Sequence, residues 1–400
     1  MKIFKPVSFL LYLFCFMPFL YFLPIPSDTQ PYAFIMACVL CLVLGKVKVP
    51  KTLFNMMWAY VLIVAGAVVT LLLAHPSEKF LVLRKVFNYI SLFLVTTAVY
   101  NSLIISGGVN EKWEKILISI WFAVGAIQTY IYPSFMLRFV SNARTGGARG
   151  VVGLASEPSF YGYMMIFFLM AVSQFKRHKR IFQVMCIAQI ILFAKSAVSL
   201  AYLAILIVCV VLKEGVQLYK KKPERIIAIG IFTIAFGFAA SIFWNDFMDA
   251  FGSTRMVTIW QDLISNIGEI HSLQQLYQLD YSVATRVNAI VTSIREFFEY
   301  GGLPHGFVYE DFSFRVESGY GTLLYELGIL GVLFIWMISK VLYKGFNKNV
   351  PMFVCISAMM FSSVQFGSPM LSFLLGYGMY NMHMQNTKEK ALQWNEMNSI

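Results

Sequence analysis

The stretch PSFYGYMMIFFLMAVSQFKRHKR, residues 158 to 180, decides the fold class. Its first 18 residues carry no charge, and the five that follow include four basic ones. An α-helix rises about 1.5 Å per residue, so roughly 20 apolar residues cross the ~30 Å hydrocarbon core of a bilayer. Lys and Arg collect in the cytoplasmic loops of membrane proteins. The stretch therefore predicts a transmembrane helix that ends at the cytoplasmic face.

The composition of the whole chain agrees with this interpretation. Hydrophobic residues make up 58% of the 400 residues and charged residues only 13%, whereas about 25% of a soluble domain is charged. Apolar stretches of suitable length recur from one end of the chain to the other. We place the predicted spans at residues 7 to 24, 32 to 45, 53 to 74, 84 to 104, 115 to 133, 158 to 175, 181 to 194, 197 to 212, 226 to 244, 319 to 340, 350 to 366 and 369 to 384.

The sequence thus predicts an all-α polytopic membrane protein of about twelve transmembrane helices, organised as one integral membrane domain over residues 1 to 400. The second, seventh and eighth spans are short, so the number twelve is approximate. With the N-terminus in the cytoplasm, the alternating loops place 21 of the 32 Lys and Arg residues inside, but only 6 of the 20 acids. Both termini are then cytoplasmic. The net charge of +12 follows from this topology and implies no nucleic-acid partner.

Two predicted extracytoplasmic segments are longer than the other connections, and long loops with their own structure are usually functional. The first, residues 134 to 157, is basic and glycine-rich, and its first acid is Glu157. Pro158 suits the first turn of the next helix, so Glu157 is predicted at the positive end of that helix. A backbone rich in glycine bends closely around a ligand.

The second segment, residues 245 to 318, lies between the ninth and tenth predicted spans. It contains two amphipathic patterns, each too short to cross a bilayer, which predict helices at the outer surface or packed on the bundle. Their apolar stripes run from Met256 to Ile267 and from Val283 to Phe298. The glycines and Pro304 in the following stretch, residues 299 to 321, predict a bend.

The residues available for chemistry lie in these outer segments, because the sequence has no nucleotide-binding P-loop, HExxH motif or dinucleotide fingerprint. Cations there oppose the positive-inside tendency, and an anionic ligand at the outer surface explains them, since guanidinium groups suit phosphate oxygens. All six cysteines lie in predicted spans, so neither disulfides nor a metal site is expected. The candidates are Arg138, Arg144, Arg149, Lys195, Arg255, Arg286, Arg295 and Arg315, the acids Glu157, Glu310, Asp311 and Glu317, and His305.

Three stretches resemble the Wzy-type O-antigen polymerases, which share an architecture with the O-antigen ligases. RGVVGLASEPSFYG, from Arg149, resembles the family's arginine, glycine and Glu-Pro pattern before a membrane helix. ATRVNAIVTSIREFF followed by GGLPHGF, residues 284 to 307, resembles the arginine-led helix and glycine turn of the large periplasmic loop. ESGYGTLLYELGILGVLF, residues 317 to 334, resembles the beginning of the next span.

This resemblance implies an architecture like that of the GT-C glycosyltransferases and a location in the bacterial inner membrane. It also implies a reaction on the periplasmic face, in which a glycan on undecaprenyl diphosphate is transferred to the non-reducing end of a lipid-linked repeat unit. No nucleotide sugar or other cofactor takes part. Partners would be the lipid-linked repeat units, the bilayer, and a chain-length regulator and flippase of the same pathway.

For the site, the resemblance implies that Arg149 and Arg286 bind the diphosphate, because arginines stabilise the charge that develops on a leaving group. The further residues assigned to diphosphate or sugar binding are Arg144, Arg138, Arg315, Lys195 and Tyr320. The attacking hydroxyl needs a base or an orienting acceptor. Glu317 and His305 both remain candidates for that role, because related ligases carry a histidine where this chain has Glu317. Glu157 is a third catalytic candidate, although it also suits a helix N-terminus without any further role.

Two other functions remain open. An O-antigen ligase would share the fold and the leaving group. A flippase for lipid-linked oligosaccharides would also have about twelve spans and a basic inner face. Such a transporter usually has ionisable residues in mid-span and two similar halves with broken helices, whereas these predicted spans are almost free of charge and the long loops are unequal.

Overall fold

The computed structural model describes residues 3–22, 27–73, 76–145, 150–221, 275, 281–307 and 318–397. In this part of the chain the regular elements are all helical, and an isolated antiparallel bridge joins Leu20 to Val140. The predicted span 226 to 244 and the predicted amphipathic helix around Met256 to Ile267 lie outside the described residues. The same is true of Arg149, Arg315 and Glu317.

The described residues of the first half of the chain form eight α-helices, and the connection between the fifth and the sixth is the long segment that the sequence predicts there. They are α1 (Phe4–Phe16), α2 (Tyr32–Leu44), α3 (Lys51–Leu73), α4 (Pro76–Ser106), α5 (Glu111–Tyr130), α6 (Pro158–Val172), α7 (Lys179–Ala188) and α8 (Ala197–Lys221). A π-helix, η2 (Gln189–Ala194), continues α7, and a 3₁₀ turn, η1 (Leu137–Phe139), lies in the connection before α6.

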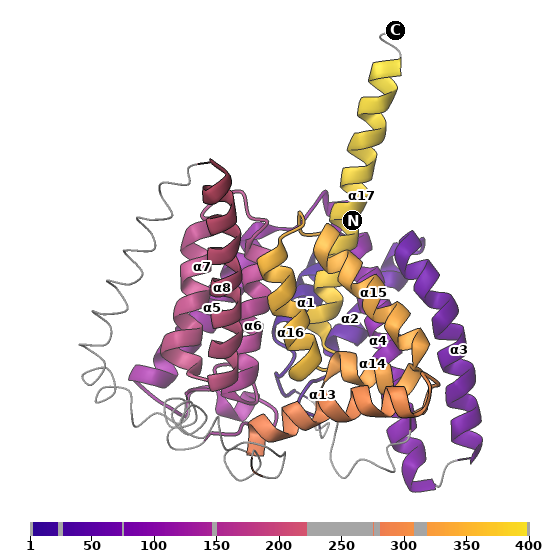
Figure 1. Ribbon diagram of the computed structural model, residues 1–400. Helices are drawn as coiled ribbons and strands as arrows, with labels where there is room; N and C mark the ends of the chain where they lie inside the picture. The colour runs from indigo at the N-terminus through magenta and orange to yellow at the C-terminus, as the bar shows by residue number, and fades with distance from the viewer. Residues whose placement is uncertain are drawn as a thin grey trace.

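The second half contributes five described helices. They are α13 (Tyr281–Glu299), α14 (Gly319–Leu327), α15 (Ile329–Lys344), α16 (Val350–Ser362) and α17 (Pro369–Met397). Most helices run in the same general direction as α6, whereas α13 crosses beneath them (Figure 1). Both termini are at the upper end in that view, where α17 projects beyond the bundle. The end that α13 crosses is called the lower end below.

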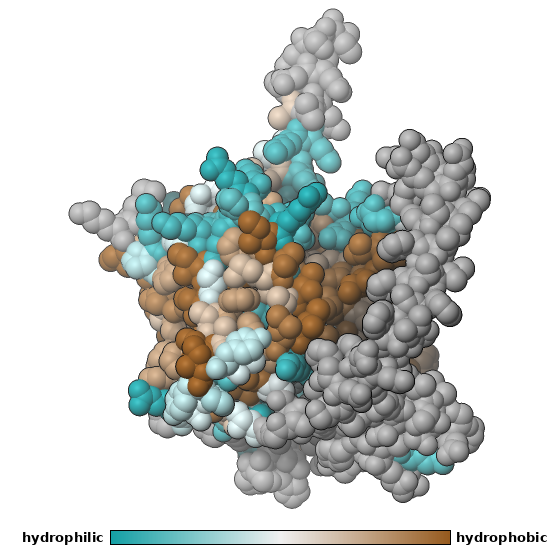
Figure 2. Space-filling model, turned by 90° about the vertical axis from the view of Figure 1, so that its left-hand side faces the viewer, coloured by the Kyte–Doolittle hydropathy of each residue, from teal (hydrophilic) through white to brown (hydrophobic). Residues whose placement is uncertain are grey.

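Two described helical stretches are long and apolar enough to cross a membrane by length and composition, Val82–Ser106 and Ala197–Val216. Shorter apolar helices, such as α1, α2, α6 and α16, accompany them. Large apolar side chains such as Ile120, Val184 and Leu192 are exposed on the surface. On the face that Figure 2 shows, hydrophobic residues form a band below a hydrophilic upper rim. These features are typical of a membrane protein, while the number of twelve spans stays a prediction.

Most predicted spans within the described residues coincide with helix. The first, residues 7 to 24, extends beyond the end of α1 at Phe16, and the tenth was wrong as a continuous helix. Residues 319 to 340 are divided into α14 and α15 at Gly328, which has φ +54° and ψ −127°. Only glycine adopts this conformation without strain. The break makes room for the turn after α13, because the Ile329 amide donates a hydrogen bond of 2.8 Å to the Gly302 carbonyl. The apolar composition of residues 319 to 340 does not indicate this break.

Helix α6 lies at the centre of the fold. Nearly all of its side chains are buried, in contact with η2 and with α7, α8, α16 and α17. A helix that is apolar all round is typical of such a buried position. Gly162 permits the close approach of α8, since a Cβ atom there would lie 2.0 Å from Ser199 Oγ. The N-terminus of α6, with Glu157 as its N-cap and Pro158 as its first residue, is therefore fixed in the middle of the lower end, and this part of the sequence prediction is confirmed.

Candidate functional site

A cavity of about 610 Å³ lies in the lower half of the bundle. Four parts of the chain form its walls: the α1–α2 connection, α4, α6 and the α16–α17 connection. Much of the wall is apolar and aromatic, with Phe34, Phe87, Phe160, Met164 and Phe167 among its residues. The polar lining residues include Ser27, Asp28, Thr29, Gln30, Arg84, Asn88, Ser91, Ser363, Gln365 and Ser368. The cavity thus combines an apolar interior with polar groups, the composition of a site for an amphipathic ligand.

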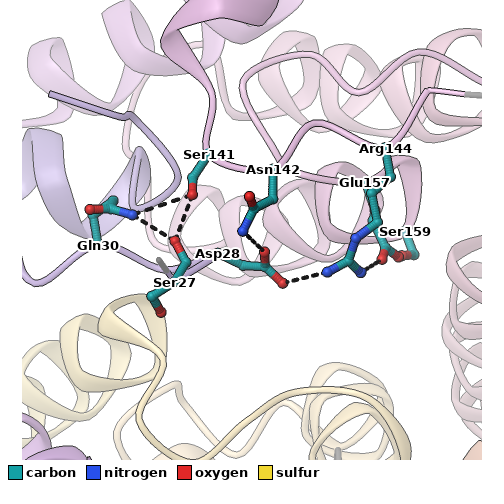
Figure 3. A network of polar contacts seen from close by, with 8 residues as sticks. All are labelled: Ser27, Asp28, Gln30, Ser141, Asn142, Arg144, Glu157 and Ser159. Carbon is teal, nitrogen blue, oxygen red and sulfur yellow. Dashed lines mark hydrogen bonds and ion pairs between the residues drawn. The ribbon is translucent and has the colours of Figure 1, made fainter. Parts of the chain in front are cut away.

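Figure 3 shows a network of charged and polar side chains. It adjoins the cavity through Ser27, Asp28 and Gln30, which line the cavity. The Arg144 guanidinium lies between two carboxylates: its Nη2 atom is 3.0 Å from Asp28 Oδ2, and its Nη1 atom donates a hydrogen bond to Glu157 Oε1. Asn142 donates to Asp28 Oδ1 at 3.0 Å, and the Ser159 hydroxyl donates to Glu157 Oε2 at 3.0 Å. The network joins two loops that are more than 100 residues apart in the sequence.

The loop that carries Asp28 is held in place by a second set of hydrogen bonds. The Gln30 amide donates to the Ser27 carbonyl at 2.6 Å and to Ser141 Oγ at 3.3 Å. Ser141 Oγ in turn donates to the Ser27 carbonyl at 2.6 Å. These contacts attach residues 27 to 30 to the segment that carries Arg144, so the distance between Asp28 and Arg144 is set by the loops themselves.

The segment before Glu157 is also anchored to the bundle. The Gln128 side-chain amide accepts a 2.8 Å hydrogen bond from the Gly153 amide and donates one of 2.9 Å to its carbonyl. The Val151 amide donates to the Phe193 carbonyl at 2.9 Å. Gly150 packs so closely on η2 that a Cβ atom would lie 2.0 Å from the Ala194 carbonyl oxygen. Gly150 of the predicted basic loop thus allows its backbone to pack directly on the backbone of η2.

The other two cations of this region, Lys195 and Arg138, are exposed. Lys195 follows η2 with a φ of +44°, and its amide donates to the Ile190 carbonyl at 3.1 Å. It lies at the lower end next to Gly150, since residue 194 contacts Gly150. A π-helix is frequently found at functional sites. Arg138 lies in η1 with its guanidinium 4.8 Å from the centre of the Phe139 ring. Neither is a cavity-lining residue.

A cluster of hydroxyl groups connects the cavity to α13. The Tyr202 hydroxyl lies 2.7 Å from Ser363 Oγ, which lines the cavity, and also hydrogen-bonds Ser362. Arg286 on α13 is half-buried and interacts electrostatically with the Tyr202 hydroxyl. The structure therefore brings Arg286 near the cavity wall formed by the α16–α17 connection, while Arg144 is near the wall formed by residues 27 to 30.

The side of α13 that packs on the bundle is formed by small residues and not by the predicted apolar stripe as a whole. Ala284, Ala289 and Ser293 are buried against α14 and α16, whereas Val287 and Val291 are exposed. Small residues allow this close packing, since a Cβ atom on Gly321 of α14 would lie 2.7 Å from Ser293 Oγ. Helix α13 is thus packed on the bundle with an apolar face turned outward.

His305 lies in the predicted bend, which is confirmed by the positive φ angles of the glycines around it. Its ring is placed between Tyr300, at 3.8 Å between ring centroids, and Tyr325, at 4.2 Å. Nε2 is 3.8 Å from Glu296 Oε2, and the side chain is only 5% exposed. This surrounding leaves little room for a sugar hydroxyl at the ring nitrogens, so the geometry suits a structural role better than that of the predicted base.

Tyr320 is also remote from solvent. Its ring is buried against Phe361, and its hydroxyl lies 3.3 Å from Ser339 Oγ. Its neighbour in the chain has a different environment: Gly319 packs so closely on the α16–α17 connection that a Cβ atom would lie 2.6 Å from the Val364 carbonyl oxygen. Val364 lines the cavity. The described residues nearest to Glu317 in the sequence therefore lie against the cavity wall.

The sequence analysis did not identify four charged residues, one of which is Arg84 in the cavity wall. Asp28 is the acid in the short connection between the first two predicted spans, and a lone loop acid gave no signal. Lys85 and Glu326 form a pair inside the bundle, where Lys85 Nζ lies 3.0 Å from Glu326 Oε1. Each of these two falls within a predicted span, and ionisable residues in spans indicate functional sites by default. The positions of Lys85 and Glu326 within predicted spans are therefore a sequence signal for this pair.

Compared with known protein families, curated proteins and solved structures, the chain has no significant match. The site geometry therefore carries the functional argument.

Proposed function

We propose that this chain is a polysaccharide polymerase of the O-antigen type, a glycosyltransferase that uses lipid-linked oligosaccharides at the periplasmic face of the bacterial inner membrane. The observation that carries this proposal is the cavity at the lower end, which combines apolar and aromatic side chains with Arg84, Asp28 and uncharged polar side chains. A substrate with an isoprenoid chain and a charged, sugar-bearing head matches both parts. Burial of its apolar chain contributes about 25 cal/mol per Å² of area removed from water.

In the proposed reaction, the bond between the glycan C1 atom and the diphosphate oxygen breaks while C1 forms a bond with an acceptor hydroxyl oxygen. The hydroxyl proton passes to a base, and undecaprenyl diphosphate leaves. Fixed cations stabilise the negative charge on this leaving group as it develops. Arg84 lines the cavity, and Arg286 lies beyond the Ser363 wall, so both are assigned to the donor side.

Glu317 is the proposed base. The residues directly after it, Ser318 and Gly319, lie at the start of α14, where the Ser318 hydroxyl accepts a 2.8 Å hydrogen bond from the Gly321 amide as the helix cap. A side chain next to a rigid helix start is better held than one in a mobile loop. Glu157 is fixed in a comparable way at the start of α6 and is assigned to the acceptor side.

The proposed protein is multi-pass, with about twelve spans and both termini in the cytoplasm. Its supporting features are the charge asymmetry of the loops and the position of both chain ends at the upper end (Figure 1). The proposed partners are lipid-linked repeat units, the bilayer, and the chain-length regulator and flippase of the same pathway.

The decisive experiment is reconstitution. The purified chain in lipid nanodiscs is mixed with undecaprenyl-diphosphate-linked repeat units, and the products are separated by size. A ladder of lengthened lipid-linked glycans is expected, without any nucleotide sugar. Transfer to a lipid A core instead would identify a ligase, and recovery of unchanged repeat units would reject both activities.

A transporter of the same lipid-linked substrate is the second candidate. The pair of Lys85 with the buried Glu326 and the helix break at Gly328 favour it, because transporters place ionisable groups and broken helices within the membrane. Vesicles separate the two functions: a polymerase lengthens repeat units that are added to one side, whereas a transporter moves unchanged repeat units to the other side.

A further inference from the structure

The network around Arg144 contains more negative than positive charge. Its guanidinium carries one positive charge and is bonded to two carboxylates, Asp28 and Glu157. The three groups together carry one net negative charge when both acids are ionised. The sequence assigns Arg144 to diphosphate or sugar binding, and the net negative charge of its surroundings decides between these two ligands.

A diphosphate is poorly suited to this network. It would approach two carboxylates of its own sign, and like charges a few ångströms apart repel strongly near a protein surface. Arg144 would also have to leave its present partners before binding it. The position of Asp28 on the cavity wall makes the repulsion relevant to any ligand inside.

Neutral sugar hydroxyls, in contrast, match the network. Each hydroxyl both donates and accepts, carboxylates accept, and guanidinium and amide groups donate. The side chains are reachable from solvent, with 21% of Asp28, 20% of Glu157 and 51% of Arg144 exposed. The amide of Asn142 adds a further donor at Asp28. An aromatic ring, Phe160, lines the cavity two residues after Pro158 and offers an apolar surface for the face of a sugar ring.

The cation of the cavity comes from another wall. Arg84 is carried by α4, together with Asn88, whereas Asp28 belongs to the α1–α2 connection. A guanidinium group with a neighbouring amide suits the oxygens of a diphosphate. The two walls thus differ in the charge of their side chains. This difference favours a neutral ligand at one wall and an anionic ligand at the other.

We infer that the Asp28–Arg144–Glu157 network binds the hydroxyl groups of a neutral acceptor sugar, while the isoprenoid diphosphate of the donor lies against the Arg84 wall of the same cavity. The naming of the second ligand rests on the proposed function. The sugar site itself rests on the contacts of Asp28, Arg144 and Glu157.

The test uses the full chain in lipid nanodiscs and two probes. The first is an array of neutral oligosaccharides that carry no lipid, and the second is geranylgeranyl diphosphate. The variants are Asp28→Asn, which keeps the size of the side chain, and Arg84→Gln. Glu299→Gln is the control, because Glu299 is an exposed carboxylate at the same end and outside the cavity.

Asp28→Asn is expected to weaken glycan binding about tenfold, the value of one hydrogen bond to a charged group, and to leave diphosphate binding equal or stronger. Arg84→Gln is expected to weaken diphosphate binding by about the same factor and to leave glycan binding unchanged. The control is expected to match the wild type with both probes. If Asp28→Asn does not fold, Asn142→Ala takes its place, with the same expected selectivity.

Weaker diphosphate binding in Asp28→Asn, or a wild type that retains no neutral glycan, overturns the inference. If both variants weaken both probes equally and the wild type still forms a ladder, the inference fails and the proposed function stands. If the wild type binds glycans through Asp28 but binds no isoprenoid diphosphate and makes no ladder, the proposed function fails and the sugar site stands.

Discussion

The Nζ atom of Lys85 on α4 lies 3.0 Å from Oε1 of Glu326 on α14, and the Glu326 side chain has no exposure to solvent. The Tyr89 hydroxyl donates a further hydrogen bond of 2.7 Å to Glu326 Oε2. The main chain at the same position holds the bend after α13, since the Gly306 amide donates to the Glu326 carbonyl. One buried carboxylate residue thus connects α4, α14 and the turn that carries His305.

The first prediction concerns the stability of this pair. Removing one partner leaves a buried charge uncompensated, so Lys85→Met and Glu326→Gln should each destabilise the protein, by about 3 kcal/mol for the worse of the two. The double variant should lose less than the sum of the single ones. Thermal unfolding in detergent, read by circular dichroism, measures all three. Strictly additive losses would show that the two side chains do not interact.

The second prediction concerns the helix break. Gly328→Ala should destabilise the protein by about 2 kcal/mol or more, because a Cβ atom would lie 2.2 Å from the Gly302 carbonyl oxygen at a φ of +54°. Gly215→Ala is the matched control, since that helical glycine of α8 has nothing within 4 Å of a Cβ atom. The control should be neutral or slightly stabilising. Equal unfolding temperatures for the two variants would contradict the break.

The third prediction is a pH dependence of stability caused by Glu114, which precedes the predicted span 115 to 133. Burial, and next the nearby charge of Glu111, raise the pKa of Glu114 from 4.5 to about 8. Both carboxylate oxygens are buried without a hydrogen-bond partner among the described residues. A raised pKa in the folded state means that the protein is most stable below pH 4.5 with respect to this group, and that this contribution is lost as the pH rises through 8.

Glu114→Gln should therefore raise the unfolding temperature at pH 8, by the equivalent of about 1–3 kcal/mol, and the difference from the wild type should shrink toward pH 4.5. Glu389→Gln, at an exposed position of α17, serves as the control and should show no such trend. A stability difference that does not change with pH would mean that Glu114 titrates normally.

The fourth prediction is the orientation in the membrane. Reporter fusions after Gly147 and after Gln275 should report the periplasm, and fusions after Lys179 and after Lys222 the cytoplasm, because basic loops remain inside. A cytoplasmic signal at Gly147 would place the cavity on the wrong side for the proposed reaction.

The fifth prediction separates the two candidate bases. Glu317→Gln preserves the size of the side chain and removes its basicity, so it should abolish polymerisation while leaving donor binding intact. His305→Ala should instead lower the unfolding temperature, since the ring is packed between Tyr300 and Tyr325, and keep most of the activity. Loss of activity in a stable His305→Ala protein would make His305 the base.

The sequence was a good guide to the helices and a partial one to the site. Apolar stretches were enough to find most of the described helices, and the Glu-Pro pair was enough to find the start of α6, because those signals are local. The break at Gly328 was not foreseeable in the same way. It depends on the turn at Gly302, which comes from a different part of the chain.

The site failed to emerge from the sequence for a similar reason. The sequence predicts that Arg144 binds a diphosphate or a sugar, because its segment contains no acid before Glu157. Its second partner, Asp28, is 116 residues away and becomes a neighbour only through folding. Pairing between distant loops reverses the sign of the local charge, and no count of charges along the chain detects that.

The burial of α6 has a consequence for how a substrate arrives. Because α6 is buried among η2, α7, α8, α16 and α17, it forms the fixed wall of the cavity, and Phe160, Met164 and Phe167 are part of that wall. Admission of a long lipid-linked glycan then depends on the non-helical walls, residues 27 to 31 and 363 to 368. Amide protons of α6 should be among the last to exchange with solvent. The opening of those two connections should set the rate at which a ligand enters the cavity.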